Sequence, residues 1–420
     1  MSPFAIIALA LILARAVTEL WLSRLNQCHV RTHRNEVPPV FRGVMDESTY
    51  RRSIDYTLAR SRFGNIVNVF DAAVLVAVLF SGLLPWAFER FSASFSTSIL
   101  AMAGFLFVTG IALSIPGLPF AWYAQFKIEE RFGFNTTTTR TWVLDRMKGF
   151  LLAVLLGYPL LALVLKLIEW TGVNWWLWAA ALVIAFQLLL LFVAPAIIMP
   201  LFNKFTPLAE GAFRQRLFAL ARRTGFPTRS IEVMDGSKRS RHSNAFFTGF
   251  GRFRKIVLFD TLIMQLTEPE VESVLAHEIG HYKKRHIIKM LSVSIAGVFV
   301  AFAAIAWLAR QQWFYRAFGF EHQGGLAAAN AVPAMLLFAL LAGTISFWVS
   351  PVVHIWSRRF EYEADAFARA AMGEAQPLIR AVRKLSEKNL SNLIPHPLYS
   401  SFYYSHPTLL ERERALRIAA

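Results

Sequence analysis

Seven stretches of the chain are apolar over about the 20 residues that a helix needs to cross the hydrocarbon core of a bilayer. They cover residues 3–22, 66–88, 98–122, 147–168, 175–199, 290–308 and 332–356. The first stretch lacks the basic start of a signal peptide, and Arg15 and Glu19 fall where the apolar core of such a peptide should end, so we expect a retained span. The pattern predicts a mainly α, polytopic bundle of seven transmembrane helices.

A few polar side chains interrupt these apolar stretches. They are Arg15, Glu19, Asp71, Gln187 and His354. Polar groups within a bilayer are costly, so they either pair with one another or line a water-filled cavity. The sequence leaves both alternatives open.

Basic residues are unevenly distributed among the connections between spans. The segments after the first, third and fifth spans are rich in Arg and Lys, whereas those after the second, fourth and sixth hold few. This alternation follows the positive-inside rule, and it places the N-terminus outside, with residues 203–289 and the C-terminus in the cytosol. Topology thereby accounts for the net charge of +17, and we expect a lipid bilayer but no nucleic acid as a partner.

The composition agrees with a membrane protein, because 55% of the residues are apolar and soluble domains hold roughly 45–50%. The only cysteine is Cys28, so neither an intramolecular disulfide nor a thiolate metal cluster can form, and a metal site must use His and carboxylate ligands. We divide the chain into residues 1–200 with five spans, a cytosolic catalytic part at 201–289, two spans at 290–356, and a cytosolic region at 357–420.

An HExxH motif lies on a helix whose start is marked in the sequence. Thr267 and Glu270 have the spacing of a capping box, which predicts a helix that runs through the motif and leads directly into the sixth span. His277 and His281 are one turn apart and can bind one Zn²⁺, while Glu278 points about 100° away and can act as the general base. Such short motifs also arise by chance, and the alternative is a surface helix with scattered His and Glu.

A catalytic zinc ion keeps three protein ligands and one open position. We expect Glu361, at the cytosolic end of the last span, to be the third ligand, so that each chain holds one Zn²⁺ on two helices that continue transmembrane helices. Asp365 shares the helix face of Glu361, and we expect it to accept the free N–H of a ligand histidine. Glu363 lies on another face and is expected in solvent. The alternative for Glu361 and Asp365 is a salt-bridged helix end with Arg358 and Arg359.

Two short strands are predicted in the cytosolic part. Residues 254–260 form one, and residues 243–248 form the other, joined to it through Gly249 and Gly251. An exposed strand beside a zinc-binding helix can hold an extended peptide by strand addition. The alternative is an ordinary small sheet without such a role.

Several sequence blocks occur in order along the chain. They are FGFN at 132–135, LFNKFTPL at 201–208, NAF at 244–246, HEIGH at 277–281, EYEAD at 361–365, YSHP at 404–407 and ER at 411–412. In these blocks, over most of its length, the chain resembles the type I CAAX prenyl endopeptidase family, seven-span membrane zinc proteases that enclose a chamber. The resemblance implies a zinc endopeptidase with a cytosolic zincin-like domain around a small sheet, acting on a peptide or protein substrate.

The resemblance also implies roles that spacing alone does not give. His406 and Arg412 would reach the active site and steady the oxyanion or the carboxy end of the substrate. Asn244, Ala245 and Phe246 would hold the substrate backbone. Eukaryotic members of the family remove the last three residues of prenylated proteins that end in a CAAX sequence.

The source and the substrate remain open at this point. Arginine outnumbers lysine, which suggests a GC-rich bacterial genome and a bacterial inner membrane; the endoplasmic reticulum is the alternative for a eukaryotic source. In a bacterium, membrane-associated or misfolded proteins would replace prenylated ones as substrates. We expect a monomer. The rival interpretations are a transporter, which should show internal repeats, and a structural zinc site, which should have a fourth ligand; we find neither in the sequence.

Overall fold

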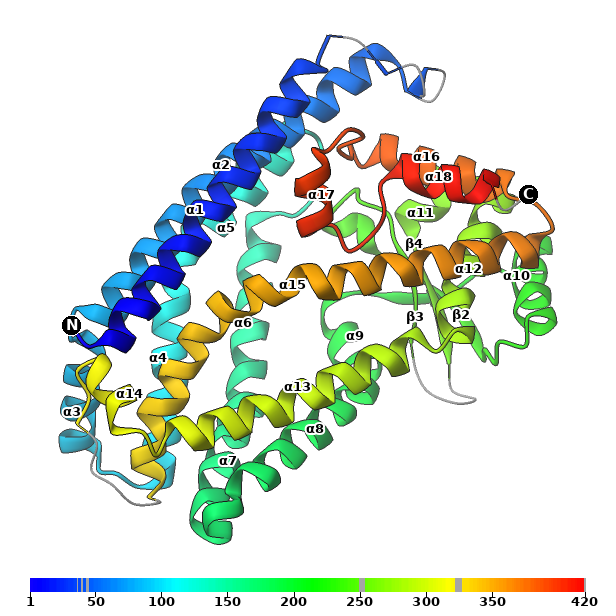
Figure 1. Cartoon of the computed structure of the whole chain (residues 1–420). Helices are drawn as coiled ribbons and strands as arrows, with labels where there is room; N and C mark the ends of the chain where they lie inside the picture. The colour runs from blue at the N-terminus through cyan, green and yellow to red at the C-terminus, as the bar shows by residue number, and fades with distance from the viewer. Residues whose placement is uncertain (36, 39–40, 43–44, 249–253, 322–326, 419–420) are drawn as a thin grey trace.

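Helices dominate the computed structural model, which describes residues 1–420 except 36, 39–40, 43–44, 249–253, 322–326 and 419–420 (Figure 1). The α-helices are α1 (Pro3–Thr32), α2 (Glu47–Phe80), α3 (Leu83–Phe95), α4 (Ile99–Ser114), α5 (Leu118–Tyr123), α6 (Thr139–Leu152), α7 (Tyr158–Thr171), α8 (Trp175–Val193), α9 (Met199–Phe202), α10 (Ala212–Arg223), α11 (Asp260–Gln265), α12 (Glu268–Lys283), α13 (His286–Leu308), α14 (Gln312–Ala317), α15 (Ala328–Met372), α16 (Gln376–Lys388), α17 (Pro397–Tyr403) and α18 (Leu409–Ile418). Short 3-10 or π-helical segments are η2 (Ile115–Gly117), η3 (Ala124–Glu129), η4 (Ala153–Gly157), η5 (Gly172–Asn174), η6 (Ala194–Ile198) and η7 (Gly236–Lys238).

Six helical runs of the described chain are long and apolar enough to cross a membrane, so the expected seven separate spans are not confirmed as a count. Five runs each overlap one expected span. The remaining run, Thr139–Phe202, covers two expected spans in 64 residues. Within it the chain turns at η5, where Gly172 has a φ of 55°, and α7 and α8 pack against each other.

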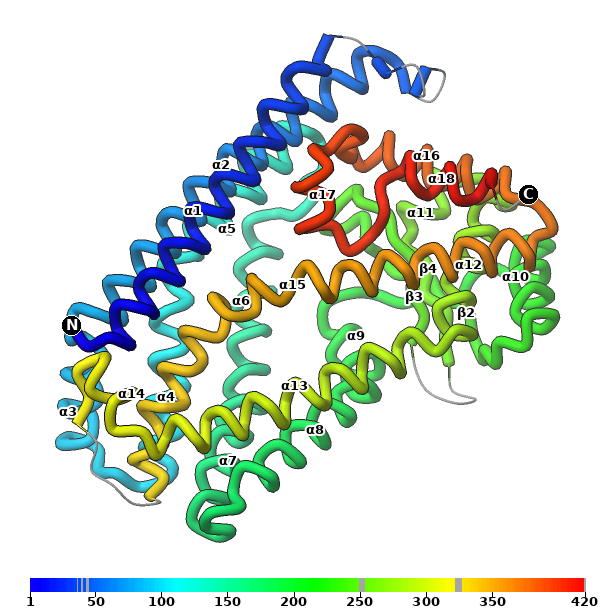
Figure 2. Tube along the Cα trace, viewed as in Figure 1, coloured from blue at the N-terminus to red at the C-terminus, as the bar shows by residue number. Residues whose placement is uncertain are grey.

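The long helices splay apart instead of forming one parallel bundle (Figures 1 and 2). The pair α1 and α2 runs along one side, and α13 packs against α8 on another. All of them meet in a core at the end that is far from the sheet, where Met102, Leu165, Phe314 and Leu337 are almost completely buried. From this end α15 extends into the part of the molecule that holds the sheet.

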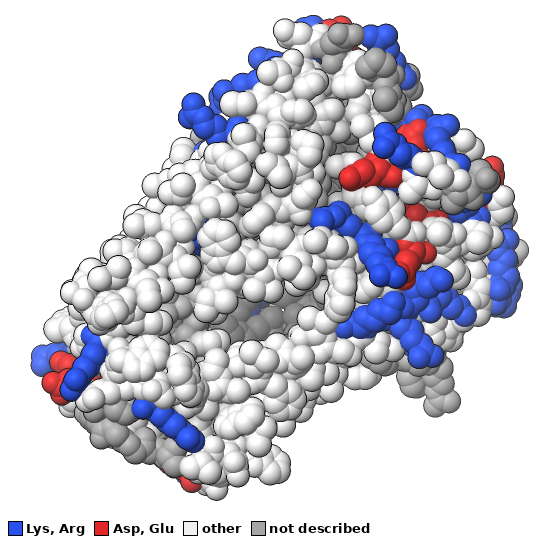
Figure 3. Space-filling model, in the orientation of Figure 1, with Lys and Arg blue, Asp and Glu red and all other residues white. Residues whose placement is uncertain are grey.

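The surface of the membrane helices carries few charged residues on the face shown in Figure 3, and it is hollowed near its middle. Large side chains such as Trp178, Val300 and Ile345 are more than half exposed. Lys, Arg, Asp and Glu gather around the part with the sheet and at the opposite end. A bilayer would cover an apolar surface of this kind.

Most of the polar residues within the spans pair inside the protein. Arg15 forms an ion pair with Glu19 at 2.9 Å. Gln187 donates a hydrogen bond to Ser294, and His354 Nδ1 lies 2.7 Å from the carbonyl oxygen of Phe402. Glu19 also borders a polar cavity, so for this residue both expected alternatives hold.

The sheet lies between residues 205 and 259 and has the order β1-β2-β4-β3. Its strands are β1 (Phe205–Pro207), β2 (Ser230–Met234), β3 (Ala245–Thr248) and β4 (Lys255–Phe259). Strand β2 pairs with β4 in parallel, while β1 and β3 are antiparallel edge strands. The two predicted strands are confirmed as β3 and β4, and the predicted link through Gly249 and Gly251 lies outside the described residues.

The two predicted metal-binding helices relate differently to the membrane spans. Helix α15 is continuous over 45 residues and carries the last span directly to Glu361, as expected. Helix α12 begins with the predicted capping box of Thr267 and Glu270. The expectation that it runs directly into the sixth span is wrong, because α12 ends at Lys283 and α13 starts anew at His286. Between them Arg285 adopts a φ of 56°.

Candidate metal centre

The candidate site lies where α12 packs along α15. Gly280 faces the backbone of α15, and this absence of a side chain lets the two helices approach closely. Packing of Leu275, Ala276 and Ile279 against the sheet and α10 fixes the opposite face of α12 in a buried core. The motif on α12 is therefore presented to α15.

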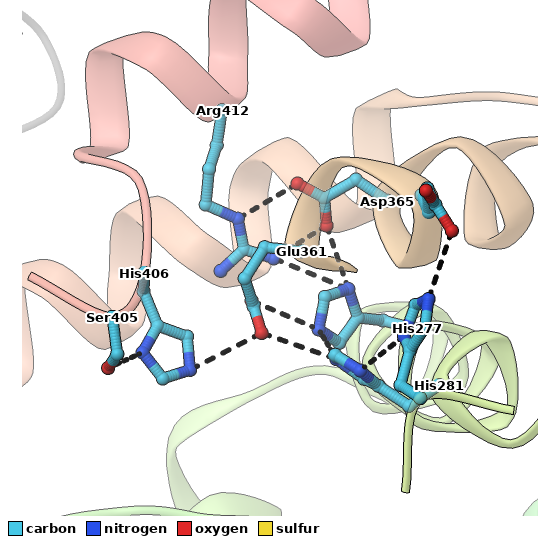
Figure 4. Close-up of polar contacts among 9 residues, drawn as sticks. His277, His281, Glu361, Asp365, Ser405, His406 and Arg412 are labelled. Atoms are coloured by element: carbon cyan, nitrogen blue, oxygen red, sulfur yellow. Dashed lines mark hydrogen bonds and ion pairs between the residues drawn. The ribbon is translucent and has the colours of Figure 1, made fainter. Parts of the chain in front are cut away.

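Three side chains converge with the spacing of a metal site. His281 Nε2 lies 3.2 Å from His277 Nε2 and 3.3 Å from Glu361 Oε1, and His277 Nε2 lies 3.5 Å from Glu361 Oε2 (Figure 4). In a tetrahedral zinc site with bonds of about 2.0–2.1 Å, neighbouring ligand atoms are about 3.4 Å apart. Glu361 Oε2 is also buried without a hydrogen-bond partner. This donor set fits a divalent cation such as Zn²⁺.

Asp365 holds one of the two imidazoles. Its Oδ1 lies 2.8 Å from His277 Nδ1, which turns Nε2 of the ring toward Glu361. Burial opposes a charge on His277, but its hydrogen bonds with Asp365 and Glu361 outweigh this effect and raise its pKa to about 9. The surroundings of the ring thus favour positive charge, as those of a metal ligand should.

Arg412 of α18 contacts Asp365 and lies behind His277. It donates two hydrogen bonds to Asp365, from Nε at 2.9 Å and from Nη2 at 2.6 Å, and its Nη2 is 3.4 Å from His277 Nδ1 (Figure 4). Such a two-pronged contact fixes the orientation of the carboxylate. The guanidinium is therefore engaged in orienting Asp365, a contact that the sequence did not suggest.

Glu278 is half-buried next to the candidate ligands. Within the described part of the chain it makes no hydrogen bond or ion pair, so its carboxylate is available to a water or a substrate group. Burial raises the pKa of Glu278 above its ordinary value, although the neighbouring imidazoles oppose this shift. A raised pKa suits a general base, because it strengthens the affinity of the carboxylate for a proton.

His406 reaches the site from the segment that precedes α18. Its Nε2 lies 3.4 Å from Glu361 Oε1 on the side away from the two imidazoles, and its Nδ1 contacts the hydroxyl of Ser405 (Figure 4). The side chain is 65% exposed. His406 can therefore meet a molecule that approaches Glu361 from outside.

The residues expected to hold the substrate lie at one edge of the sheet. Ala245 and Phe246 begin the edge strand β3, and the Asn244 carbonyl accepts a hydrogen bond from Phe259 N–H. Strand β3 packs against α12. An edge strand in this place can pair with an extended peptide close to the candidate ligands.

Two further residues, His286 and Glu363, form a chain of contacts that starts at His281, and the sequence did not place them there. The Nδ1 atom of His281 lies 3.0 Å from Nδ1 of His286, whose Nε2 lies 3.1 Å from Glu363 Oε2. The expectation that Glu363 is in solvent is wrong, because His286 and Arg359 both contact its carboxylate. A histidine five residues beyond the motif was the only available signal.

A polar cavity of about 830 Å³ opens beside the site. Its walls come from α1, α2, α16 and α17 and from the segment with His406 and Arg412. Asn26, Asn65 and Asn68 are among the residues that line it. Asparagines at the edges of apolar helices are the sequence signal for this cavity.

Comparison with known proteins agrees with this geometry. Residues 26–204 match the N-terminal domain of CAAX prenyl proteases, described as five membrane helices, and residues 207–420 match peptidase family M48. "CAAX prenyl protease 1" of Saccharomyces cerevisiae is 36% identical over 91% of this chain and 88% of its own length. Its human homologue is 31% identical over 95% of this chain and 92% of its own length.

A solved structure matches the whole fold. The crystal structure of S. mikatae Ste24p superimposes with a TM-score of 0.89 at 34% identity, and covers 99% of both chains. The bacterial origin suggested by the arginine content gains no support from these eukaryotic relatives. The chain belongs to peptidase family M48, with the membrane domain of the CAAX prenyl proteases, and is a multi-pass membrane metalloprotease.

Proposed function

We propose that this metalloprotease holds one Zn²⁺ on His277, His281 and Glu361 and cuts lipidated, membrane-attached polypeptides near their carboxy end. The observation that carries the proposal is the spacing of 3.2–3.5 Å among the two Nε2 atoms of the histidines and the carboxylate oxygens of Glu361, with Glu278 beside them. These residue types at these distances form the donor set of a catalytic zinc site with an open position.

In this mechanism the bound zinc ion supplies a Lewis acid that acidifies water and polarises the scissile carbonyl. Glu278 accepts the proton of the attacking water and later gives it to the leaving amine. Asp365 keeps the proton of His277 on Nδ1. His406, exposed beside Glu361, donates a hydrogen bond to the developing oxyanion.

We assign Arg412 a positioning role through Asp365 rather than a contact with the substrate. Its two hydrogen bonds to Asp365 support this assignment. The family resemblance had implied instead that Arg412 steadies the oxyanion or the carboxy end of the substrate.

The substrate backbone pairs with β3, through Asn244, Ala245 and Phe246. The antiparallel edge position of this strand supports the pairing. The adjoining polar cavity takes the peptide, and the apolar surface of the membrane helices accommodates the lipid. The name of the relatives, CAAX prenyl protease 1, agrees with a prenylated carboxy-terminal substrate.

The active site faces the cytosol in this proposal. Lys283, Lys284, Arg285 and Lys289 lie next to the site where α12 meets the membrane helix α13, as the positive-inside rule requires of the cytosolic side. A monomer suffices for this chemistry, because one chain carries all the proposed catalytic groups.

Cleavage of one peptide in prenylated and unprenylated forms tests the proposal. Purified full-length protein should cleave the prenylated form faster, lose activity with a zinc chelator and regain it with Zn²⁺. Mass spectrometry of the products should find the cut near the carboxy end. Equal cleavage of both forms would show that the enzyme does not recognise the lipid. Cleavage that resists the chelator would show that it does not need the metal.

A further inference from the structure

The two candidate histidine ligands are supported differently. His277 is held by Asp365 directly. His281 instead contacts a second histidine, His286, through their Nδ1 atoms at 3.0 Å, and His286 Nε2 lies 3.1 Å from Glu363 Oε2. The chain from His281 to Glu363 thus runs through two rings and ends at a carboxylate.

The hydrogen-bonding capacities of these groups determine where the protons are. An ionised carboxylate only accepts hydrogen bonds, so Nε2 of His286 carries the hydrogen that points to Glu363. In the neutral ring, Nδ1 of His286 is then an acceptor. It takes the Nδ1–H of His281, which leaves the lone pair of His281 on Nε2, the atom that faces His277 and Glu361.

The ring of His286 is held firmly in the orientation that this arrangement needs. It is 3% exposed and stacks on Phe360, with ring centres 4.2 Å apart and an interplanar angle of 11°. Glu363 is in turn contacted by Arg359 at 3.2 Å and by Lys289 at 3.8 Å. These contacts therefore hold both His286 and Glu363 in place.

The backbone break at Arg285 brings His286 to this position. On one continuous helix a residue five positions after His281 would lie about 140° round the axis from it. Arg285 has a φ of 56°, in the left-handed region that favours glycine, so a residue with a side chain adopts it only under backbone strain. This break ends α12 and returns His286 to the side of His281.

We propose that His286 and Glu363 are positioning residues that form a relay, Glu363 to His286 to His281, which fixes the tautomer and the orientation of His281 for metal binding. One helix, α15, then supplies the ligand Glu361 and both orienting carboxylates, Asp365 for His277 and Glu363 for His281. This inference rests on the proposed metal centre and extends it to the residues around it.

Zinc affinity measured by chelator competition, with full-length protein in detergent, tests the relay. His286→Phe keeps an aromatic ring against Phe360 but removes the acceptor, and it should weaken zinc binding about tenfold to a hundredfold. His286→Asn places a carboxamide oxygen near the lost Nδ1 and should restore most of the affinity. If His286 only filled space, His286→Phe, which keeps the ring, should bind zinc at least as tightly as His286→Asn.

Glu363→Met provides a second variant in case His286→Phe does not fold. It should also weaken zinc binding about tenfold to a hundredfold, whereas Glu374→Met, at an exposed position beyond α15, should not. Unchanged affinity in folded His286→Phe or Glu363→Met would overturn the relay. A wild-type protein that binds no stoichiometric zinc would instead overturn the metal centre itself, so the two failures are distinguishable.

Discussion

Gly280 of α12 approaches Ala364 of α15 so closely that a Cβ atom on Gly280 would lie 2.9 Å from the Cα of Ala364 and 3.0 Å from its carbonyl oxygen. The obstructing atoms belong to the backbone, so a side chain cannot be accommodated by a rotamer change. Gly280→Ala should push the helices apart at a cost of about 1–3 kcal/mol and separate His277 and His281 from Glu361. Thermal unfolding and metal analysis would measure the loss of stability and of bound zinc.

Gly110→Ala in α4 is the matched control. The same substitution in this helix meets no atom within 4 Å, so stability and zinc content should be retained. If Gly280→Ala behaved like this control, close approach of α12 and α15 would not be what forms the site.

Glu278 should be needed for the chemistry and not for the fold. Its carboxylate has no protein partner in the described part of the chain, so Glu278→Gln removes no hydrogen bond. We expect kcat to fall by a factor of about 10²–10⁴ or more while zinc content and the unfolding temperature stay near those of the wild type. Steady-state kinetics and metal analysis on one preparation would test both parts.

His277→Ala gives the contrasting outcome. Removal of a ligand should lower the zinc content and the activity together. A Glu278→Gln protein that lost its zinc in the same way would show that Glu278 is structural.

Local patterns in the sequence predict which side chains converge at the candidate metal centre. The capping box at Thr267, the four-residue spacing of His277 and His281, and the pairing of Glu361 with Asp365 each depend on a few neighbouring residues. The spans were predicted equally well because hydropathy is also a local property. Only their count is not confirmed, because the single helical run Thr139–Phe202 covers two of the expected spans.

The features of the site that could not be predicted from the sequence depend on contacts between distant segments or on an unusual backbone conformation. No sequence rule marks Arg285 as the residue with positive φ, so the break before α13, and with it the place of His286, could not be predicted. Arg412 is 47 residues from Asp365, and its role followed only from their contact. Glu363 is expected in solvent from its helix face alone, because its partner His286 lies on another helix.

Arg412 should affect metal binding more than the chemical step. Arg412→Met leaves the buried Asp365 with one partner fewer, and removing one member of a buried pair costs about 3–5 kcal/mol. The zinc affinity of Arg412→Met should also fall, because Asp365 orients His277. Chelator competition, together with kcat at saturating zinc, would separate the effects. A lower kcat at full zinc occupancy would favour the substrate-stabilising role that the sequence suggested.

The attachment of α18, which carries Arg412, should weaken in acid. Burial opposes the ionisation of Glu413, but hydrogen bonds from Arg383 of α16 and from Arg417 outweigh it and hold the pKa of Glu413 below its ordinary value. A carboxylate with a lowered pKa in the folded state stabilises the protein above its unfolded-state pKa, and this contribution is lost as the pH falls through the folded-state pKa. Glu413→Gln should therefore unfold at a lower temperature than the wild type at neutral pH, and the difference should shrink as the pH falls below the ordinary glutamate pKa of about 4.3. Glu374→Gln, at an exposed position, serves as the control and should show no such convergence; a Glu413→Gln difference that stayed constant across this pH range would show that the ion pair does not hold α18 in place.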